Sequence, residues 1–409
     1  MSNRKAAHRP RCIRHVLTSL AAVSTLLASK HACCVSSLSV PPSTPSSLDN
    51  KLMPMPRPPS QSASNSLYNI ILQNRPNSPK SAIPLTGVHD ALSAKIFAQH
   101  GAPALFLSGF GVSASLLGIP DAGMTNLVEM EMMTRHVYSA IRSSSSNIPP
   151  PLIVDGDTGY GGAANMLRTI STLSRAGAAA ISIEDQIFPK KCTIAAGSKI
   201  QIVSREEAVE RVRGAIGARD LYYEQQRQHH HHHQVVEEGN SNDCGNGTWI
   251  VARTDCRMAY GFEEVIERCL RFEELGAEVI YAENLQTVDE YQQLRERLDA
   301  RTVTMIAQVQ ESLDAGDRNK AAEVGKKPLL TLQEIAELGY DMALFGVTPL
   351  QSVVGALDAT AKQLLGSAKD EHAATGIISA PISMADFSDL KQVVGFDELE
   401  RFESEFPCN

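Results

Sequence analysis

The sequence predicts an α/β protein with a (β/α)8 barrel, because short apolar runs alternate with stretches of helical spacing and because there are eight such runs. Uninterrupted apolar runs are typical of parallel strands that helices cover on both faces. The roughly 300 residues that contain the runs match the usual size of a TIM barrel. We therefore expect a single barrel with its core inside and around the strands.

The expected strands are the apolar runs themselves, each of which ends in a polar cluster. They are residues 84–87, 104–107, 151–154, 180–183, 249–252, 279–282, 303–306 and 342–345. In a TIM barrel the chemistry lies at the C-terminal ends of the strands. The charged residues that directly follow most of these runs therefore predict an active site at that rim.

The N-terminal 66 residues differ in composition from the rest. The first acidic residue is Asp49, and it is preceded by scattered Arg and Lys and by an apolar run at residues 16–28. That run is too short to cross a bilayer, so no membrane anchor is expected. The composition fits a transit peptide for a mitochondrion or plastid, and a secretory or two-step plastid signal also fits. Residues 35–66 are rich in Pro and Ser and are interpreted as a linker.

Residues 67–409 are expected to form the barrel, with two low-complexity insertions at about 222–247 and 311–327. The first contains five consecutive histidines, which we interpret as incidental to function. The formal net charge of -8 gives no basic footprint for nucleic acid. The eight cysteines show no zinc-binding spacing.

Three carboxylates follow neighbouring runs. Asp155 and Asp157 follow the third run, and Glu184 follows the fourth. Carboxylates that leave room for water and for substrate oxygens suit Mg²⁺, with Mn²⁺ as the alternative cation. We predict that these three residues bind the metal. The alternatives are a turn or helix cap for the Asp pair and a salt bridge for Glu184.

The segment at 154–161 (VDGDTGYG) resembles the D-x-D-x-G-[YF]-G motif of the isocitrate lyase and phosphoenolpyruvate mutase superfamily. Five further motifs are similar to those of this superfamily and occur in the same order, so that the resemblance covers residues 68 to 405. They lie at residues 108–111, 118–121, 183–186, 190–192 and 252–255. This resemblance implies a metal-dependent enzyme that acts on small carboxylic acids.

The resemblance also implies which residues bind the substrate. Ser108 and Gly109 would donate hydrogen bonds to a substrate carboxylate, and Arg253 would hold it with a planar guanidinium. Phe110, Glu283 and Gln308 complete the expected substrate-binding set. From the residues alone, Ser108 and Gly109 also fit a turn at a strand end, and Arg253 fits an ion pair with Asp255 or Glu283.

Cys192 matches the thiol of the carbon–carbon lyases of the superfamily, which moves a proton at the enolate. The flanking lysines favour its thiolate form, and Lys191 is therefore predicted with it as catalytic. Asp121 matches a catalytic aspartate near the metal, although Pro-Asp also begins many helices. An isolated Cys is, in the absence of such motifs, more often inert.

The sequence departs from the lyase pattern after Cys192, where residues 193–196 replace Gly-His, and after the seventh run, where Gln308 replaces Asn. The leading interpretation is a 2-methylisocitrate lyase-like enzyme that breaks or hydrolyses a carbon–carbon bond through a metal-stabilised enolate. A carbon–phosphorus phosphonomutase and a barrel that binds carboxylates without turnover are the alternatives. The resemblance also implies a homotetramer in which neighbouring subunits exchange C-terminal helices. Residues 390–406 are expected to form the exchanged helix.

Overall fold

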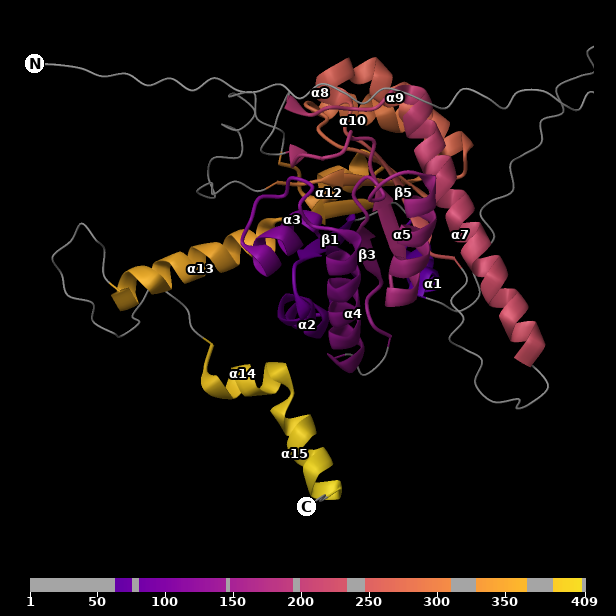
Figure 1. Ribbon diagram of the computed structural model, residues 1–409. Coiled ribbons are helices and arrows are strands. Elements are labelled where there is room, and N and C mark those ends of the chain that lie inside the picture. The colour runs from indigo at the N-terminus through magenta and orange to yellow at the C-terminus, as the bar shows by residue number, and fades with distance from the viewer. Residues whose placement is uncertain are drawn as a thin grey trace, which may run out of the picture. The chain divides into compact units, whose positions relative to one another are not determined.

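The computed structural model describes residues 63–75, 81–144, 148–193, 199–233, 247–309, 329–365 and 385–406 (Figure 1). Eight parallel strands form a closed barrel in which each strand pairs with the next along the chain and β8 pairs with β1. They are β1 (Ile83–Val88), β2 (Ala104–Leu107), β3 (Leu152–Asp155), β4 (Ala180–Ile183), β5 (Trp249–Thr254), β6 (Val279–Ala282), β7 (Val303–Ala307) and β8 (Met342–Phe345). The predicted (β/α)8 barrel is confirmed, and each expected run coincides with a strand to within two residues at either end.

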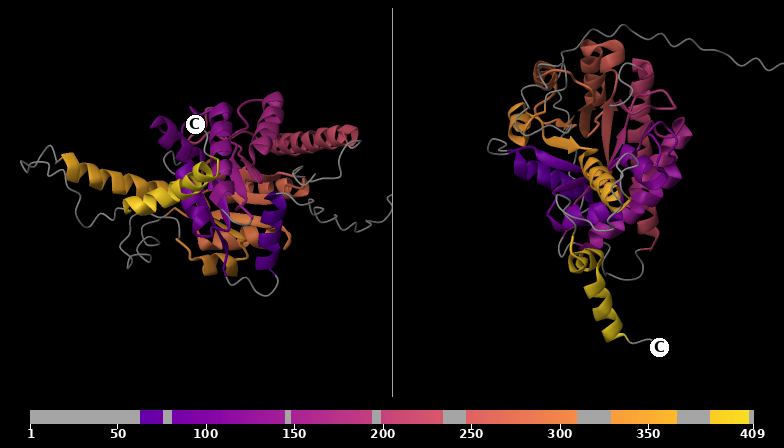
Figure 2. Two further views of the ribbon diagram at one scale, coloured as in Figure 1. Left: turned by 90° about the horizontal axis from the view of Figure 1, so that it is seen from below. Right: turned by 90° about the vertical axis from the view of Figure 1, so that its left-hand side faces the viewer.

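Helices connect the strands and cover the outside of the barrel. They are α1 (Ala63–Asn74), α2 (Ala91–Gln99), α3 (Gly109–Val112), the π-helical turn η1 (Ser113–Leu117), α4 (Leu127–Ser144), α5 (Ala163–Ala176), α7 (Arg205–His233), α8 (Arg257–Tyr260), α9 (Phe262–Glu274), α10 (Val288–Arg297), α12 (Leu332–Glu337), α13 (Thr348–Leu365), α14 (Phe387–Val394) and α15 (Phe396–Glu405). Along one side, α2, α4, α5 and α7 lie next to one another in chain order (Figures 1 and 2).

Side chains alternate across each strand, as the period of two requires. In β2, Ala104 and Phe106 belong to the cluster inside the barrel, whereas Leu105 and Leu107 pack under the outer helices. Helix α1 closes the end where the strands begin, since its buried Leu67 joins the inner cluster. The opposite end, where the strands finish, is left for polar side chains.

Local sequence explains where several helices begin. Asp90 caps α2, because its carboxylate accepts a 2.7 Å hydrogen bond from the backbone of Ser93. Thr331 and Glu334 form a capping box at the start of α12. Such caps satisfy backbone N–H groups that the first helical turn leaves without partners.

The expected insertions lie partly within the described residues. Helix α7 continues to His233, so the first part of the range 222–247 is helical, while residues 234–246 lie outside the described residues. The range 311–327 and residues 1–62 of the predicted targeting segment also lie outside them. Among the helices that are described, none has both the length and the apolar character needed to cross a membrane.

The C-terminal helices carry apolar residues that the chain does not cover. Phe387 of α14 is 73% exposed, and Phe402 of α15 is 61% exposed. Each of these helices has an apolar face, although none of their side chains whose burial is described is buried. The predicted exchange of these helices between subunits stays a prediction for a single chain.

Candidate active site

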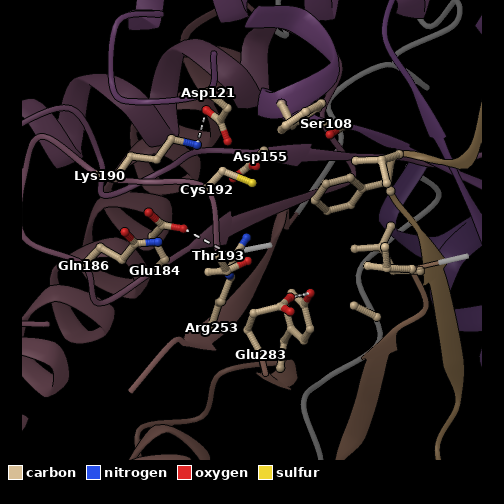
Figure 3. A pocket seen from close by; sticks show the side chains of 18 of the residues that line it. Ser108, Asp121, Asp155, Glu184, Gln186, Lys190, Cys192, Thr193, Arg253 and Glu283 are labelled. Carbon is tan, nitrogen blue, oxygen red and sulfur yellow. Dashed lines mark hydrogen bonds and ion pairs between the residues drawn. The ribbon is translucent and has the colours of Figure 1, made fainter. Parts of the chain in front are cut away.

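One pocket lies at the rim where the strands end, and Figure 3 shows most of its side chains. Every predicted site residue lines it except Gly109 and Asp157. The predicted residues in its lining are Ser108, Phe110, Asp121, Asp155, Glu184, Lys191, Cys192, Arg253, Glu283 and Gln308. The structure therefore brings together residues that are far apart in the sequence.

The turn after β3 presents Asp155 to this pocket and holds Asp157 behind it. The backbone N–H of Asp157 donates to Asp155 Oδ1 at 3.2 Å, and Asp157 has a left-handed φ of 48°. Gly156 lets the turn lie against β4, because a Cβ atom there would be 2.8 Å from Ile181 Cγ2. A non-glycine residue with positive φ is uncommon and often marks a functional turn.

Gly109 lies next to these two carboxylates without lining the pocket. Its N–H donates to Asp155 Oδ2 at 3.3 Å, and a Cβ atom there would be 3.0 Å from the same oxygen. A side chain at position 109 would therefore push against Asp155. In this structure Gly109 supports the carboxylate, and the hydroxyl of neighbouring Ser108 accepts from Gly111 N at 3.2 Å.

Lys190 was not among the predicted site residues, yet its ammonium lies at the centre of the carboxylates. Its Nζ is 2.6 Å from Asp121 Oδ1 and 2.7 Å from Asp157 Oδ1, and the residue is 4% exposed. Burial lowers the pKa of Lys190, but attraction to Asp157, Glu184 and Asp155 outweighs this and holds the pKa well above its usual value. Lys190 is thus a fixed cation.

Asp157 titrates in an unusual range for the same reasons. Burial raises the pKa of its carboxyl to about 6, and the charges of Asp155 and Asp121 add to this, while Lys190 opposes it. Lys190 therefore only partly compensates for the loss of hydration. The ion pair of Lys190 with Asp157 was not predicted from the sequence, in which Lys190 comes two residues before Cys192 and far from Asp157.

Glu184 has an oxygen without a partner among the described residues. Its Oε1 atom is buried with no hydrogen bond, and its Oε2 atom is 3.5 Å from Arg253 Nη2. Burial raises the pKa of Glu184 well above its usual value, although the charge of Arg253 opposes the shift. A buried oxygen of this kind normally has a partner, so this one points to a bound group.

Arg253 forms an ion pair with Asp255, which is one of the two ion pairs that the sequence left open for this residue. Arg253 donates from Nε at 2.8 Å and from Nη2 at 3.2 Å to the two carboxylate oxygens of Asp255. Asp255 also accepts from Gln186 Nε2 at 2.6 Å, and Gln186 in turn accepts from the backbone of Lys191 at 2.9 Å. Gln186 therefore links the arginine to the loop that carries Cys192, a role that its sequence position did not reveal.

Glu283 and Gln308 line the pocket with much of their polarity already satisfied. The hydroxyl of Tyr281 donates to Glu283 Oε2, and the guanidinium of Arg253 lies 5.4 Å from the centre of the Tyr281 ring. Gln308 accepts from the backbone N–H of Leu330 at 2.8 Å and donates to Ala307 O at 3.1 Å. Both the carbonyl oxygen and the amino group of the Gln308 side chain are therefore hydrogen-bonded to backbone groups.

Cys192 lines the pocket at intermediate exposure and is in no disulfide among the described residues, and Figure 3 draws it next to Asp155. Its backbone N–H donates to Asp121 O at 3.0 Å, which fastens the loop to the segment before α4. The side chain of Lys191 is exposed at the pocket, whereas Lys190 is committed to carboxylates. The two lysines that flank the thiol therefore have different surroundings.

The oxygen ligands at the rim fit a hard cation. Among the residues that the structure describes, no three His, Cys, Asp or Glu side chains converge into a complete ligand group. Mg²⁺ does not need one, because it keeps several waters and is commonly held by one or two carboxylates together with substrate oxygens. Asp155 in the pocket and the partnerless oxygen of Glu184 meet that requirement.

Comparison with known proteins gives several matches along most of the chain. The 2,3-dimethylmalate lyase of Eubacterium barkeri is 29% identical over 79% of this chain and 94% of its own length. The 2-methylisocitrate lyase of Aeropyrum pernix is 30% identical over 78% and 85%. The chloroplastic carboxyvinyl-carboxyphosphonate phosphorylmutase of Arabidopsis thaliana is 31% identical over 79% and 80%.

Solved structures agree on the fold. A 2,3-dimethylmalate lyase has a TM-score of 0.65 at 26% identity, over 84% of this chain and 95% of that one. Oxaloacetate acetylhydrolase with 3,3-difluorooxalacetate has 0.66 at 24% identity, over 86% and 99%. Phosphonopyruvate hydrolase with oxalate and Mg²⁺ has 0.61 at 21% identity, over 85% and 100%.

A family model adds the remaining evidence, because the model described as phosphoenolpyruvate phosphomutase matches residues 75–365, which contain the whole barrel and the pocket. The predicted resemblance is thereby confirmed, and this chain belongs to the phosphoenolpyruvate phosphomutase family of the isocitrate lyase and phosphoenolpyruvate mutase superfamily.

Proposed function

We propose that this chain is a Mg²⁺-dependent lyase that cleaves a carbon–carbon bond of a small 2-hydroxy or 2-oxo di- or tricarboxylate. The observation that carries the proposal is the thiol of Cys192 in the same pocket as Asp155, Glu184 and Arg253. Bond cleavage next to a carboxylate needs a proton donor for the carbon that is released, and a thiol can supply the proton. Relatives named as lyases support this enzyme class.

Asp155, Asp157 and Glu184 would hold Mg²⁺, with Mn²⁺ as the alternative cation. When bound, the ion would supply positive charge beside the substrate oxygen on which negative charge develops. Ser108 and the Nη1 group of Arg253, which the Asp255 pair leaves unused among the described residues, would bind the substrate carboxylate.

The residues of the chain then account for the atoms of the cleavage. In a 2-hydroxy acid, the Asp121 carboxylate would accept the hydroxyl proton as the carbonyl forms, and the electrons of the broken bond stay on the departing carbon. The Cys192 thiol delivers a proton to that carbon. Asp121 and Lys190 would keep the thiol in place through the loop, and exposed Lys191 would attract the anionic substrate.

The direct test is incubation of the purified protein with Mg²⁺ and 2-methylisocitrate, isocitrate, 2,3-dimethylmalate or oxaloacetate. We expect release of pyruvate, glyoxylate or oxalate, loss of that release with a chelator, and recovery with added Mg²⁺. Cys192→Ala should abolish turnover while calorimetry still shows oxalate binding. Ligand binding without product from any compound would instead favour the barrel that binds carboxylates without turnover.

A second candidate is chemistry at a carbon–phosphorus bond. The Arabidopsis thaliana relative is named as a phosphorylmutase, and one similar structure is a phosphonopyruvate hydrolase. Phosphorus NMR with phosphonopyruvate would detect this activity. Conversion of phosphonopyruvate faster than any carbon-only acid would replace the leading proposal, whereas Cys192 in the pocket favours the lyase.

Import into a mitochondrion or plastid is also proposed, from the composition of residues 1–66 and the chloroplastic relative. Fusion of residues 1–66 to a fluorescent protein tests it, and secretion of the fusion would contradict it. We propose a homotetramer because α14 and α15 expose Phe387 and Phe402. Light scattering would give the mass, and a monomer would rule the tetramer out.

A further inference from the structure

The pocket has two chemically different halves, which follow the order of the strands around the barrel. Strands β3 to β6 and the loops after them contribute charged residues, including Asp155, Glu184, Arg253 and Glu283. Strands β7, β8 and β2 with the segments after them contribute mainly apolar ones, and Asp121, which also follows β2, is paired with Lys190 of the charged half. The apolar residues are Phe106, Phe110, Ala307, Val309, Leu344 and Val347. Because β7, β8, β1 and β2 are consecutive in the closed barrel, the apolar residues form one arc.

The polar groups of the apolar half are already used. Both ends of the Gln308 amide are bound to backbone, at 2.8 Å to Leu330 N and at 3.1 Å to Ala307 O. Ser108 lies at the border with the charged half, since Gly109 next to it donates to Asp155. The other described residues that line this half have no charged or hydrogen-bonding side chain.

The cations of the pocket are committed elsewhere. Lys190 is held between Asp121 and Asp157, and Arg253 is paired with Asp255 and lies near Glu184 of the charged half. Exposed Lys191 lies on the loop after β4. A carboxylate against the apolar arc would therefore be buried without a described cation beside it, which is strongly unfavourable.

We propose that the substrate is a dicarboxylate that carries an alkyl group on the carbon next to the cleaved bond, and not a tricarboxylate. This inference rests on the proposed function, in which the charged half takes the 2-hydroxy or 2-oxo carboxylate end. The alkyl group lies against Phe106, Leu344 and Val347, where a tricarboxylate would place its third carboxylate. Each buried methylene is expected to raise kcat/KM about fourfold.

The sharpest test compares two compounds of matched shape. 2-Methylisocitrate carries a carboxymethyl group, and 3-isobutyl-2-methylmalate carries an isobutyl group with the same branching and no charge. With Mg²⁺, we expect the isobutyl compound to have at least about a tenfold higher kcat/KM and to bind at least about tenfold more tightly. Equal or better binding of 2-methylisocitrate, or binding of neither compound, would overturn the inference.

Binding and turnover separate this inference from the proposed function. If the isobutyl compound binds more tightly but no compound in the panel is cleaved, the proposed lyase is wrong. The inferred preference of the site for an alkyl group over a third carboxylate then stands. If 2-methylisocitrate is cleaved and preferred, the lyase stands and the substrate class is wrong.

A substitution in the arc gives a second test. Val309→Arg places a cation beside the apolar half at a partly exposed position, and should shift the ratio of the two kcat/KM values about tenfold toward 2-methylisocitrate. Val354→Arg is the control, because Val354 is 57% exposed on α13 and does not line the pocket. An unchanged ratio in a folded Val309→Arg protein would count against the arc as the determinant.

Discussion

Two layers of charged side chains lie at the same strand ends, and they differ in how well they are satisfied. The supporting layer, Asp185, Asp255 and Arg268, is at most 1% exposed and fully bonded. Asp185 accepts from the hydroxyl of Thr254 at 2.5 Å, from the backbone of Asp255 at 2.8 Å and from Arg268 at 2.9 Å. The pocket layer consists of Asp155, Glu184, Arg253 and Glu283, which line the pocket. In this layer, by contrast, Glu184 keeps an oxygen without a partner in the described part of the chain.

The difference follows from neighbouring residues that point in opposite directions. Glu184 lines the pocket, whereas the next residue, Asp185, reaches Arg268 on the outer helix α9. A satisfied layer fixes the strand ends, and an unsatisfied layer keeps its bonding capacity for a ligand. Substitutions in the supporting layer should therefore affect folding first, and substitutions in the pocket layer should affect activity first.

The largest expected loss of stability comes from Arg268→Met. It leaves Asp185 as a buried charge without its cation, so the free energy of unfolding should fall by about 3–5 kcal/mol. Arg271→Met is the matched control on the same helix. Arg271 is exposed and pairs with exposed Glu274, so its loss should be under about 1 kcal/mol. Equal losses in urea denaturation would show that the supporting layer does not stabilise the fold.

Glu184→Gln should show the opposite behaviour. Burial raises the pKa of Glu184, so the folded state is penalised for this carboxylate at every pH above its unfolded pKa. Removal of the charge should therefore raise the free energy of unfolding by about 1 kcal/mol at pH 7 without metal. At the same time kcat/KM should fall by about a hundredfold. Lower stability together with normal activity would place Glu184 in the supporting layer.

How far the sequence predicts these layers depends on the range of the interactions. The strands were predictable because a strand that is buried on both faces appears in the sequence as an uninterrupted apolar run, such as 180–183. Asp155 and Glu184 were predictable because Asp155 ends β3 and Glu184 directly follows β4. Lys190 and Gln186 were not, since their partners Asp157, Asp121 and Asp255 are reached only after the loop folds back. Of residues 193–196, which replace Gly-His, the structure describes only Thr193, and residues 194–196 lie outside the described residues.

The smallest expected effect is the pH dependence of metal binding, and it tests Asp157, which lies behind the residues that line the pocket. The pKa of Asp157 is raised to about 6, so the carboxylate takes up a proton as the pH falls through that value. Protonation removes a negative charge beside Asp155. Mg²⁺ affinity, measured by calorimetry, should therefore be nearly constant above about pH 7 and should fall by about tenfold between pH 7 and pH 5.

Asp157→Asn is the control for this titration. The variant should bind Mg²⁺ more weakly at pH 8 and should lose the step near pH 6, because position 157 no longer has a group that titrates. A step of unchanged size in Asp157→Asn would assign the titration to another carboxylate. Glu184 is then the residue to test, because burial raises its pKa as well and it shares the pocket layer with Asp155.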